Sequence, residues 1–272
     1  MLDATEKKRD FFRQRSEITA ENAVNLIERL AGRRDLDGHA HVFHLSDPMI
    51  ENRRYTPGQD APLSEWLSHL LANELKGGTL VQPSFLGTDN SRLLASMRQA
   101  QRDGWDVTGS VQVEGSCTVE DLVVLRQAGV VSVRLNMLGQ QNPVLDRPLV
   151  ERIIAAQLAI ELHAPAKETM TIAPQIMARG GCLILDHYGL AESAETLKVL
   201  ASLSHDGLLF VKASAPYRLP IADADQAEAV REFTIMLREE LGENRLIYGS
   251  DWPHTQHPQI LSFQSAFESV LQ

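Results

Sequence analysis

The sequence predicts a single α/β domain, a (β/α)8 or TIM barrel, with a short helical extension at its N-terminus. Eight short apolar segments alternate with segments in which apolar residues recur at helical spacing, which is the pattern that such a barrel requires. The chain of 272 residues is long enough for one large domain, and no linker rich in Pro, Gly or Ser divides it. We therefore expect residues 1–34 to form the extension and residues 35–272 to form the barrel.

Each barrel strand is predicted from a short apolar run, and each helix from an amphipathic segment that follows it. The predicted strands are 37–43, 79–83, 106–113, 130–136, 158–163, 182–187, 208–213 and 245–251. The predicted helices are 63–75, 90–102, 119–128, 149–156, 167–179, 194–203, 225–241 and 258–271. In the extension, Val24, Ile27 and Leu30 recur at near-helical spacing within 17–32. This helix can cover one end of the barrel or mediate a homo-oligomer.

Composition and charge exclude several classes of function. Hydrophobic residues make up 43% and charged residues 23% of the chain, the ordinary balance of a soluble globular protein. A formal net charge of −10 argues against a protein that neutralises nucleic-acid phosphates. No run approaches the roughly 18 apolar residues of a membrane span, and the highly charged N-terminus lacks the apolar region of a secretory signal. We expect a cytoplasmic protein without nucleic-acid or membrane partners.

Ionisable side chains gather at the C-terminal ends of the predicted strands. His39 and His41 lie two apart on the first strand and so share a face. His163 ends the fifth strand, His187 the sixth and Asp251 the eighth. Active sites of such barrels lie at this end, so four imidazoles and one carboxylate are expected to meet in one mouth.

Several of these stretches resemble the amidohydrolase superfamily. They are His39-Ala40-His41, the histidines that end the fifth and sixth strands, and Gly249-Ser250-Asp251-Trp252-Pro253-His254. The stretches 82–90 and 133–139 are similar to those of the lactone-hydrolysing branch around 2-pyrone-4,6-dicarboxylate lactonase. The likeness runs from about residue 35 to the C-terminus.

The resemblance implies a hydrolase that opens the lactone ring of a small carboxylated substrate, as in the catabolism of aromatic compounds. Asp251 is then expected to act as the general base that takes a proton from water. His39, His41 and His187 are expected to polarise the carbonyl by direct hydrogen bonds. Alternatively, these histidines, with His163 and Asp251, hold one zinc or manganese ion that polarises it.

A dinuclear metal centre is not expected. Two-metal members of the superfamily use a carboxylated lysine on the fourth strand, where this sequence has Arg134. Related decarboxylases open with Glu-x-His-x-His, whereas Asp37 stands in the first place here. The alternatives are a mononuclear-metal decarboxylase and a barrel that binds a carboxylate without turning it over, although a pure binder has no need of Asp251.

Substrate binding is expected from arginines and tyrosines near the mouth. Arg134 and Arg218 can hold a carboxylate with a bidentate guanidinium, while Tyr55 and Tyr217 lie on mouth loops. Leu190 stands where the pyrone lactonase has an arginine. A monocarboxylate or a sugar-acid lactone is therefore an alternative to a dicarboxylate substrate.

Overall fold

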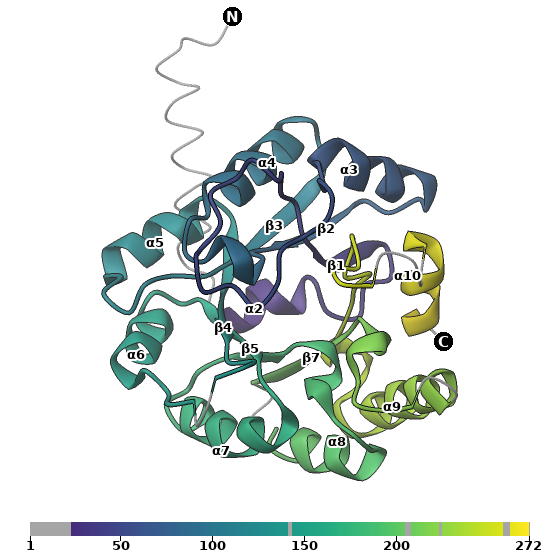
Figure 1. The fold of residues 1–272 in the computed structure, drawn as a ribbon. Coiled ribbons are helices and arrows are strands. Elements are labelled where there is room, and N and C mark those ends of the chain that lie inside the picture. Colours follow the sequence, from purple (N-terminus) through teal and green to yellow (C-terminus); the bar gives the residue numbers. More distant parts are fainter. Residues whose placement is uncertain (1–22, 141–142, 205–207, 223–224, 258–261, 272) are drawn as a thin grey trace, which may run out of the picture.

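The computed structural model describes residues 23–140, 143–204, 208–222, 225–257 and 262–271. It confirms the predicted barrel: eight parallel strands, paired in chain order, curl around an axis with helices outside them (Figure 1). The strands are β1 (Leu36–Ala40), β2 (Gly77–Val81), β3 (Asp106–Val111), β4 (Val130–Asn136), β5 (Ala159–His163), β6 (Leu183–Leu185), β7 (Leu209–Ala213) and β8 (Leu246–Tyr248).

The helices follow their strands as predicted, with ends that differ by a few residues. They are α3 (Leu63–Ala72), α4 (Ser91–Arg102), α5 (Val119–Gln127), α6 (Arg147–Ala155), α7 (Ala166–Met177), α8 (Ala194–Ala201), α9 (Gln226–Leu241) and α10 (Phe263–Leu271). Short 3-10 turns, η2 (His187–Leu190) and η3 (Pro216–Arg218), follow β6 and β7. No helix in the described part of the chain is both long and apolar enough to cross a membrane.

The barrel closes between β1 and the segment that follows β8. The backbone N–H of Asp251 donates to the carbonyl of His39 at 2.8 Å, and the N–H of His41 donates to the carbonyl of Trp252 at 2.8 Å. These two bonds set the register of the predicted histidine pair against the predicted base. The closure therefore places the three side chains at one point of the barrel mouth.

The buried carboxylate of Asp37 stabilises this closure. Asp37, on β1, accepts hydrogen bonds from the Ser250 N–H at 2.8 Å, the Ser250 hydroxyl at 2.7 Å and the Trp66 indole N–H at 2.9 Å. Burial raises the pKa of Asp37 to about 6, against the effect of these donors, so the group is ionised at neutral pH. Asp37 thus ties β1, the end of β8 and α3 together.

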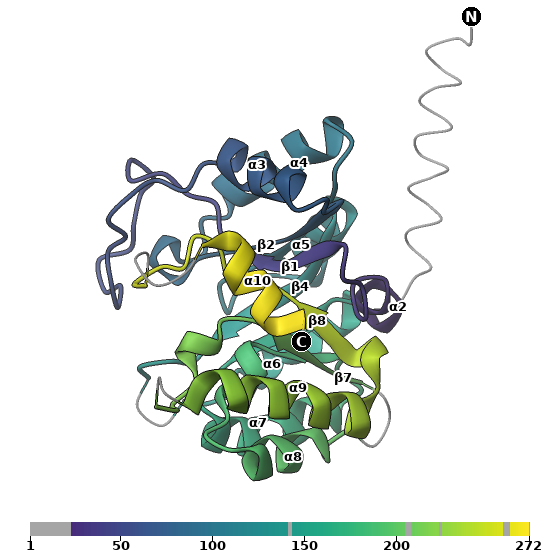
Figure 2. The same ribbon diagram turned by 90° about the vertical axis from the view of Figure 1, so that its right-hand side faces the viewer.

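Helix α2 (Ala23–Glu28) covers the opposite end of the barrel, away from the loop that follows β1 (Figure 2). Its side chains join those of the barrel floor in one buried apolar cluster, which is Ala23, Ile27, Leu30, Ala31, Leu36, Val131, Ala159, Cys182, Ile184, Phe210 and Ile247. Of the two roles predicted for the extension, the described residues take the first, covering one end. The rest of the predicted helix, 17–22, lies outside the described residues.

Several strands are shorter than predicted. β1 ends at Ala40, so His41, which was predicted to lie on this strand, follows it, and in two further strands the difference also concerns the site. β6 ends at Leu185 and β8 at Tyr248, so His187 and Asp251 lie in the loops beyond. Both have positive φ, 50° for His187 and 59° for Asp251, which a β-strand cannot contain. Backbone strain of this kind is often concentrated at functional sites.

Candidate active site

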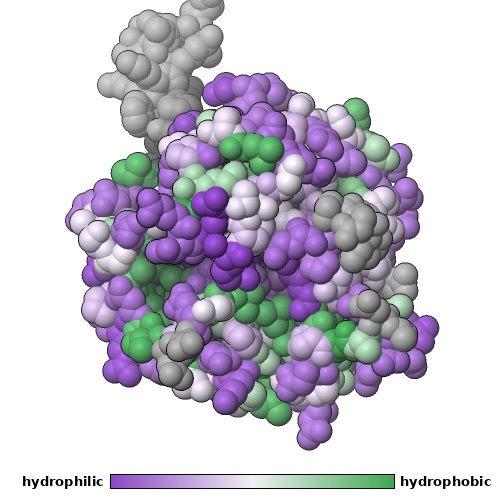
Figure 3. Space-filling view, in the orientation of Figure 1, coloured by the Kyte–Doolittle hydropathy of each residue, from purple (hydrophilic) through white to green (hydrophobic). Residues whose placement is uncertain are grey.

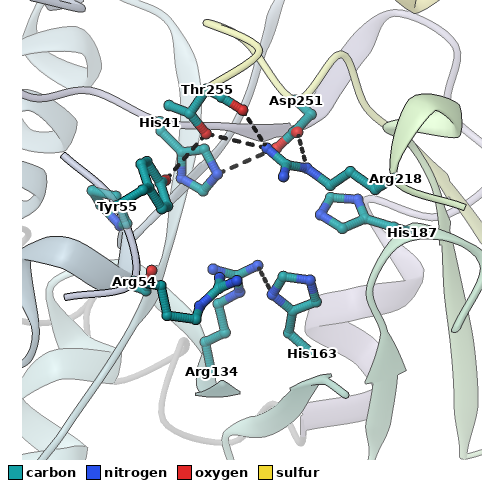
Figure 4. Close-up of a pocket in the computed structure, with 11 residues that line it drawn as sticks. His41, Arg54, Tyr55, Arg134, His163, His187, Arg218, Asp251 and Thr255 are labelled. Carbon is teal, nitrogen blue, oxygen red and sulfur yellow. Dashed lines mark hydrogen bonds and ion pairs between the residues drawn. The ribbon is translucent and has the colours of Figure 1, made fainter. Parts of the chain in front are cut away.

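A cavity opens at the C-terminal ends of the strands. Polar side chains surround the centre of this face in the space-filling view (Figure 3). Seven of the predicted site residues line the cavity, namely His41, Tyr55, Arg134, His163, His187, Arg218 and Asp251. Four further residues line it that the sequence did not single out, namely Arg54, Pro83, Ser84 and Thr255 (Figure 4).

The two oxygens of Asp251 have different surroundings. Oδ2 accepts hydrogen bonds from the Tyr217 hydroxyl at 2.6 Å and from Arg218 Nε at 2.8 Å. Oδ1 is buried and has no hydrogen-bond partner. It lies 3.3 Å from His41 Nε2 and 3.5 Å from His39 Nε2. Oδ1 is therefore the atom of Asp251 that can accept a proton from a molecule in the cavity.

Asp251 is ionised at neutral pH. Burial alone would raise the pKa of its carboxyl group, but the charge of Arg218 and neighbouring hydrogen bonds outweigh burial and hold that pKa well below the usual value. Arg218 is itself anchored by Thr255, whose carbonyl and hydroxyl oxygens accept from Nη2 at 3.0 and 3.1 Å. Thus Arg218 and Tyr217, both predicted to bind substrate, contact the predicted base in this structure.

Two of the predicted histidines have neighbours that indicate which ring nitrogen carries the proton. The Val81 carbonyl lies 2.7 Å from Nδ1 of His41; a carbonyl only accepts, so Nδ1 carries a proton, and Nε2 of the neutral ring is the acceptor. Arg134 Nη2 lies 2.9 Å from Nδ1 of His163; a guanidinium only donates, so the proton of His163 is on Nε2. That Nε2 is buried without a partner at the cavity.

His187 completes the row of imidazoles on the cavity wall. Its Nδ1 lies 2.8 Å from the hydroxyl of Ser214, and its ring centroid is 5.2 Å from that of His163. Burial lowers the pKa of His187 to about 4, while burial and the Arg134 charge hold the pKa of His163 well below its usual value. Both rings are therefore neutral at physiological pH.

His39 lies behind His41 and does not line the cavity. It is completely buried, with Nε2 3.3 Å from His41 Nε2 and Nδ1 3.2 Å from the Nζ atom of Lys212. Its Nε2 atom is also 3.5 Å from Asp251 Oδ1, so His39 lies against both His41 and Asp251. The cavity-facing imidazoles are those of His41, His163 and His187.

A buried network of charges lies beneath the histidines. Arg134 pairs with Asp186 at 2.8 Å, and Lys212 pairs with Glu161 at 2.8 Å. The sequence analysis missed Glu161, Asp186 and Lys212 because each sits in or beside an apolar run. The alternation of side chains along a strand could have indicated Glu161. It precedes His163 by two residues, and so its side chain also points into the barrel.

Arg54 is a further important residue that was not predicted from the sequence. Figure 4 shows it beside Arg134, across the cavity from Asp251. Arg134 and Arg218 have acidic partners, whereas no hydrogen bond or ion pair joins the Arg54 guanidinium to another described residue. Leu190, in contrast, is buried and does not line the cavity.

Buried His and Asp side chains in this region lie close enough to one another to hold a metal ion. Within the described residues, two sets of three place their ligand atoms within 4.8 Å of one another: His39, His41 and Asp251, and His39, Asp186 and His187. His41 and Asp251 Oδ1 offer free lone pairs for such an ion. His39 belongs to both sets, so the position of its proton decides whether either set fits a metal.

Comparison with known proteins identifies the family. The model of the amidohydrolase family matches residues 36–272. The chain belongs to this family. It is 28% identical over 234 residues to the 4-sulfomuconolactone hydrolase of Rhizobium radiobacter, covering 80% of this chain and 75% of that protein.

Solved structures of the family support the same assignment. A protein from Acinetobacter baumannii, assigned as a 2-pyrone-4,6-dicarboxylic acid hydrolase and holding citric acid, is 32% identical with a TM-score of 0.78, over 86% of this chain and 90% of that one. A Pseudomonas putida protein with the same assignment is 36% identical with a TM-score of 0.78, over 86% and 88%. These relatives are lactone hydrolases by assignment, which matches the resemblance seen in the motifs.

Proposed function

We propose that this amidohydrolase opens the lactone ring of a small carboxylated substrate by hydrolysis. The observation that carries the proposal is Asp251 Oδ1, a buried and ionised carboxylate oxygen. Among the described residues it has no hydrogen-bond partner, and it faces a cavity with Arg54 on its far side. A pure binding protein for anions has no use for a carboxylate in that position, because it would repel the ligand.

Asp251 acts as the general base in this proposal. Its Oδ1 takes a proton from water while the water oxygen attacks the lactone carbonyl carbon, giving a tetrahedral oxyanion. The ring C–O bond then breaks, and the ring oxygen leaves with the proton that Asp251 returns to it. The products are a carboxylate, which releases the second water proton to solvent, and a free enol or alcohol.

Hydrogen-bond donors on the cavity wall stabilise the oxyanion. The Nε2–H of His163 is buried, lacks a partner and is fixed in place by Arg134, so it is the donor that the geometry favours most. His187 lies beside it and donates in the same way when Ser214 donates to its Nδ1. His39, which was predicted to contact the carbonyl, supports the base instead in this scheme.

The substrate class follows from the charge of the cavity, whose wall carries Arg54, Arg134 and Arg218. Arg54 has an unused guanidinium that can hold a carboxylate with two hydrogen bonds. The relatives' assigned substrates are acidic lactones, and citric acid occupies one relative, so 2-pyrone-4,6-dicarboxylate and sugar-acid lactones are the compounds to test first.

The cofactor proposal is either none or one divalent ion, zinc or manganese, and no dinuclear centre. Arg134 occupies the strand-four position where the two-metal members of the superfamily carry lysine, and it is engaged with Asp186 and His163. When bound, an ion would polarise the carbonyl and lower the pKa of water. His41 and Asp251 would be its ligands.

The test is turnover of 2-pyrone-4,6-dicarboxylate and a set of sugar-acid lactones by chelator-treated enzyme, with and without added zinc or manganese. Hydrolysis by wild type, together with a loss of at least about a hundredfold in Asp251→Asn, supports the proposal. Equal turnover by the variant would refute the role of the base. Turnover that depends wholly on added metal would select the single-ion form.

A further inference from the structure

Lys212 is a buried cation that the proposed reaction does not use. It lies on β7 with its side chain inside the barrel and only 2% exposed. Its Nζ atom lies 2.8 Å from Glu161 Oε2, 3.2 Å from His39 Nδ1 and 3.7 Å from Asp186 Oδ1. Paired in this way with carboxylates, it is an ammonium group, which has three donors and no acceptor.

This contact determines where His39 carries its proton. An N–H on Nδ1 would face the N–H groups of Lys212 at 3.2 Å, which places two donors against each other. We propose that Lys212 is a positioning residue: it donates to Nδ1 of His39 and thereby fixes the proton of that ring on Nε2. The inference rests on the proposed function, since it assigns His39 its part in holding the base.

The three groups around Nε2 of His39 support this assignment independently. His41 Nε2 lies 3.3 Å away and Asp251 Oδ1 3.5 Å away, and both are acceptors. Without a proton on His39 Nε2, three lone-pair atoms would converge on one point with nothing between them. With the proton there, the N–H of His39 lies between the two acceptors, and its attraction for both holds the imidazole of His41 and the carboxylate of Asp251 in place.

The same proton conflicts with a metal at this position. A metal ligand needs a lone pair on the ligating nitrogen, and His39 Nε2 has none in this tautomer. Its Nδ1 in turn faces the ammonium group of Lys212. His39 therefore fits neither of the two sets of metal-ligating side chains to which proximity assigns it.

Removal of Lys212 should reverse this arrangement. Asp186 Oδ1 lies 3.5 Å from His39 Nδ1 and has no hydrogen-bond partner among the described residues, so it can accept a hydrogen bond from an N–H at that nitrogen. In Lys212→Met the His39 proton is then expected on Nδ1. Nε2 of His39 would join His41 Nε2 and Asp251 Oδ1 as a free ligand, and the hydrogen-bonded triad would become a metal-binding triad.

The experiment is ¹⁵N NMR of histidine-labelled protein, combined with a zinc titration. The His39 signals are identified by their loss in His39→Gln. The wild type should show the proton on Nε2 and bind zinc weakly, while Lys212→Met should show it on Nδ1 and bind zinc at least tenfold more tightly. A wild-type proton on Nδ1, or an unchanged tautomer and zinc affinity in the variant, would overturn the proposal.

A second variant shows whether misfolding of Lys212→Met, rather than the loss of its contact with His39, causes the result. Lys212→Met leaves Glu161 without its partner, so the double variant with Glu161→Gln keeps the buried charge balanced. Glu161→Gln alone retains Lys212 and should keep the Nε2 proton; a tautomer change in this variant would contradict the role of Lys212. Because these readouts need no substrate, they remain decisive even if no lactone is hydrolysed.

Discussion

Arg54→Met is expected to reduce the turnover of carboxylated lactones while leaving the fold intact. Arg134 and Arg218 are already engaged with Asp186 and Asp251, so Arg54 is the cavity arginine that is free to bind the substrate. Its loss removes a charge-assisted hydrogen-bonded contact of about 1.5–3 kcal/mol. Since each 1.4 kcal/mol is tenfold, kcat/KM should fall roughly ten- to hundredfold.

The stability of this variant should be close to that of the wild type. The Arg54 side chain has no hydrogen bond or ion pair with another described residue, so the free energy of unfolding should change by less than about 0.5 kcal/mol. Arg54→Lys, which keeps the charge but loses the bidentate fork, should show a smaller loss of kcat/KM.

The assay compares a carboxylated lactone with its neutral methyl ester, in wild type, Arg54→Met and Arg53→Met. Arg53 is the matched control, because it bonds to Thr56 Oγ1 and the Ile50 carbonyl and does not line the cavity. The loss should appear for Arg54→Met and the carboxylated lactone alone. An equal loss with the ester, or none with the acid, would refute the assignment.

Three further outcomes are expected. Asp251→Asn should lower kcat by about 10²–10⁴, measured under substrate saturation, with the KM changing less. Asp37→Ala should lower the free energy of unfolding by at least about 3 kcal/mol in urea, because buried donors of Ser250 and Trp66 lose their acceptor, whereas Asp35→Ala, at a partly exposed ion pair, should cost less than about 1 kcal/mol. Burial lowers the pKa of His187 to about 4, against about 6.5 unfolded, so the unfolded state binds the proton more readily and stability should fall as pH drops from 6.5 to 4. About 3 kcal/mol of that fall should come from His187, so the fall should be smaller by this amount in His187→Gln; an identical pH slope in the variant would contradict it.

The fold and the general location of the site could be predicted because both follow from periodicity. Eight apolar runs separated by amphipathic helices allow few other architectures, and the strand ends of a parallel barrel share one mouth. His41, His163, His187 and Asp251 were predicted to meet in that mouth, and the structure places all four on the cavity wall.

The remaining features depend on contacts that strand spacing does not specify. His39 shares a face with His41, but the close approach of β1 to the end of β8 buries it behind its neighbour. In the sequence, Lys212 looks like a strand residue whose charge faces solvent. Its burial depends on the ion pair with Glu161, which neutralises that charge. Arg54 lies in the long loop after β1, and the course of that loop determines which of two adjacent arginines reaches the cavity.

The most direct test of the proposed lactonase is the loss of the ultraviolet absorbance of 2-pyrone-4,6-dicarboxylate, followed with chelator-treated wild type and Asp251→Asn side by side. We predict that the pyrone ring opens with the wild type and that Asp251→Asn slows it by at least about a hundredfold. Equal rates in the two proteins would contradict general-base catalysis by Asp251. No hydrolysis of this compound, and none of the sugar-acid lactones, would contradict the lactonase assignment itself.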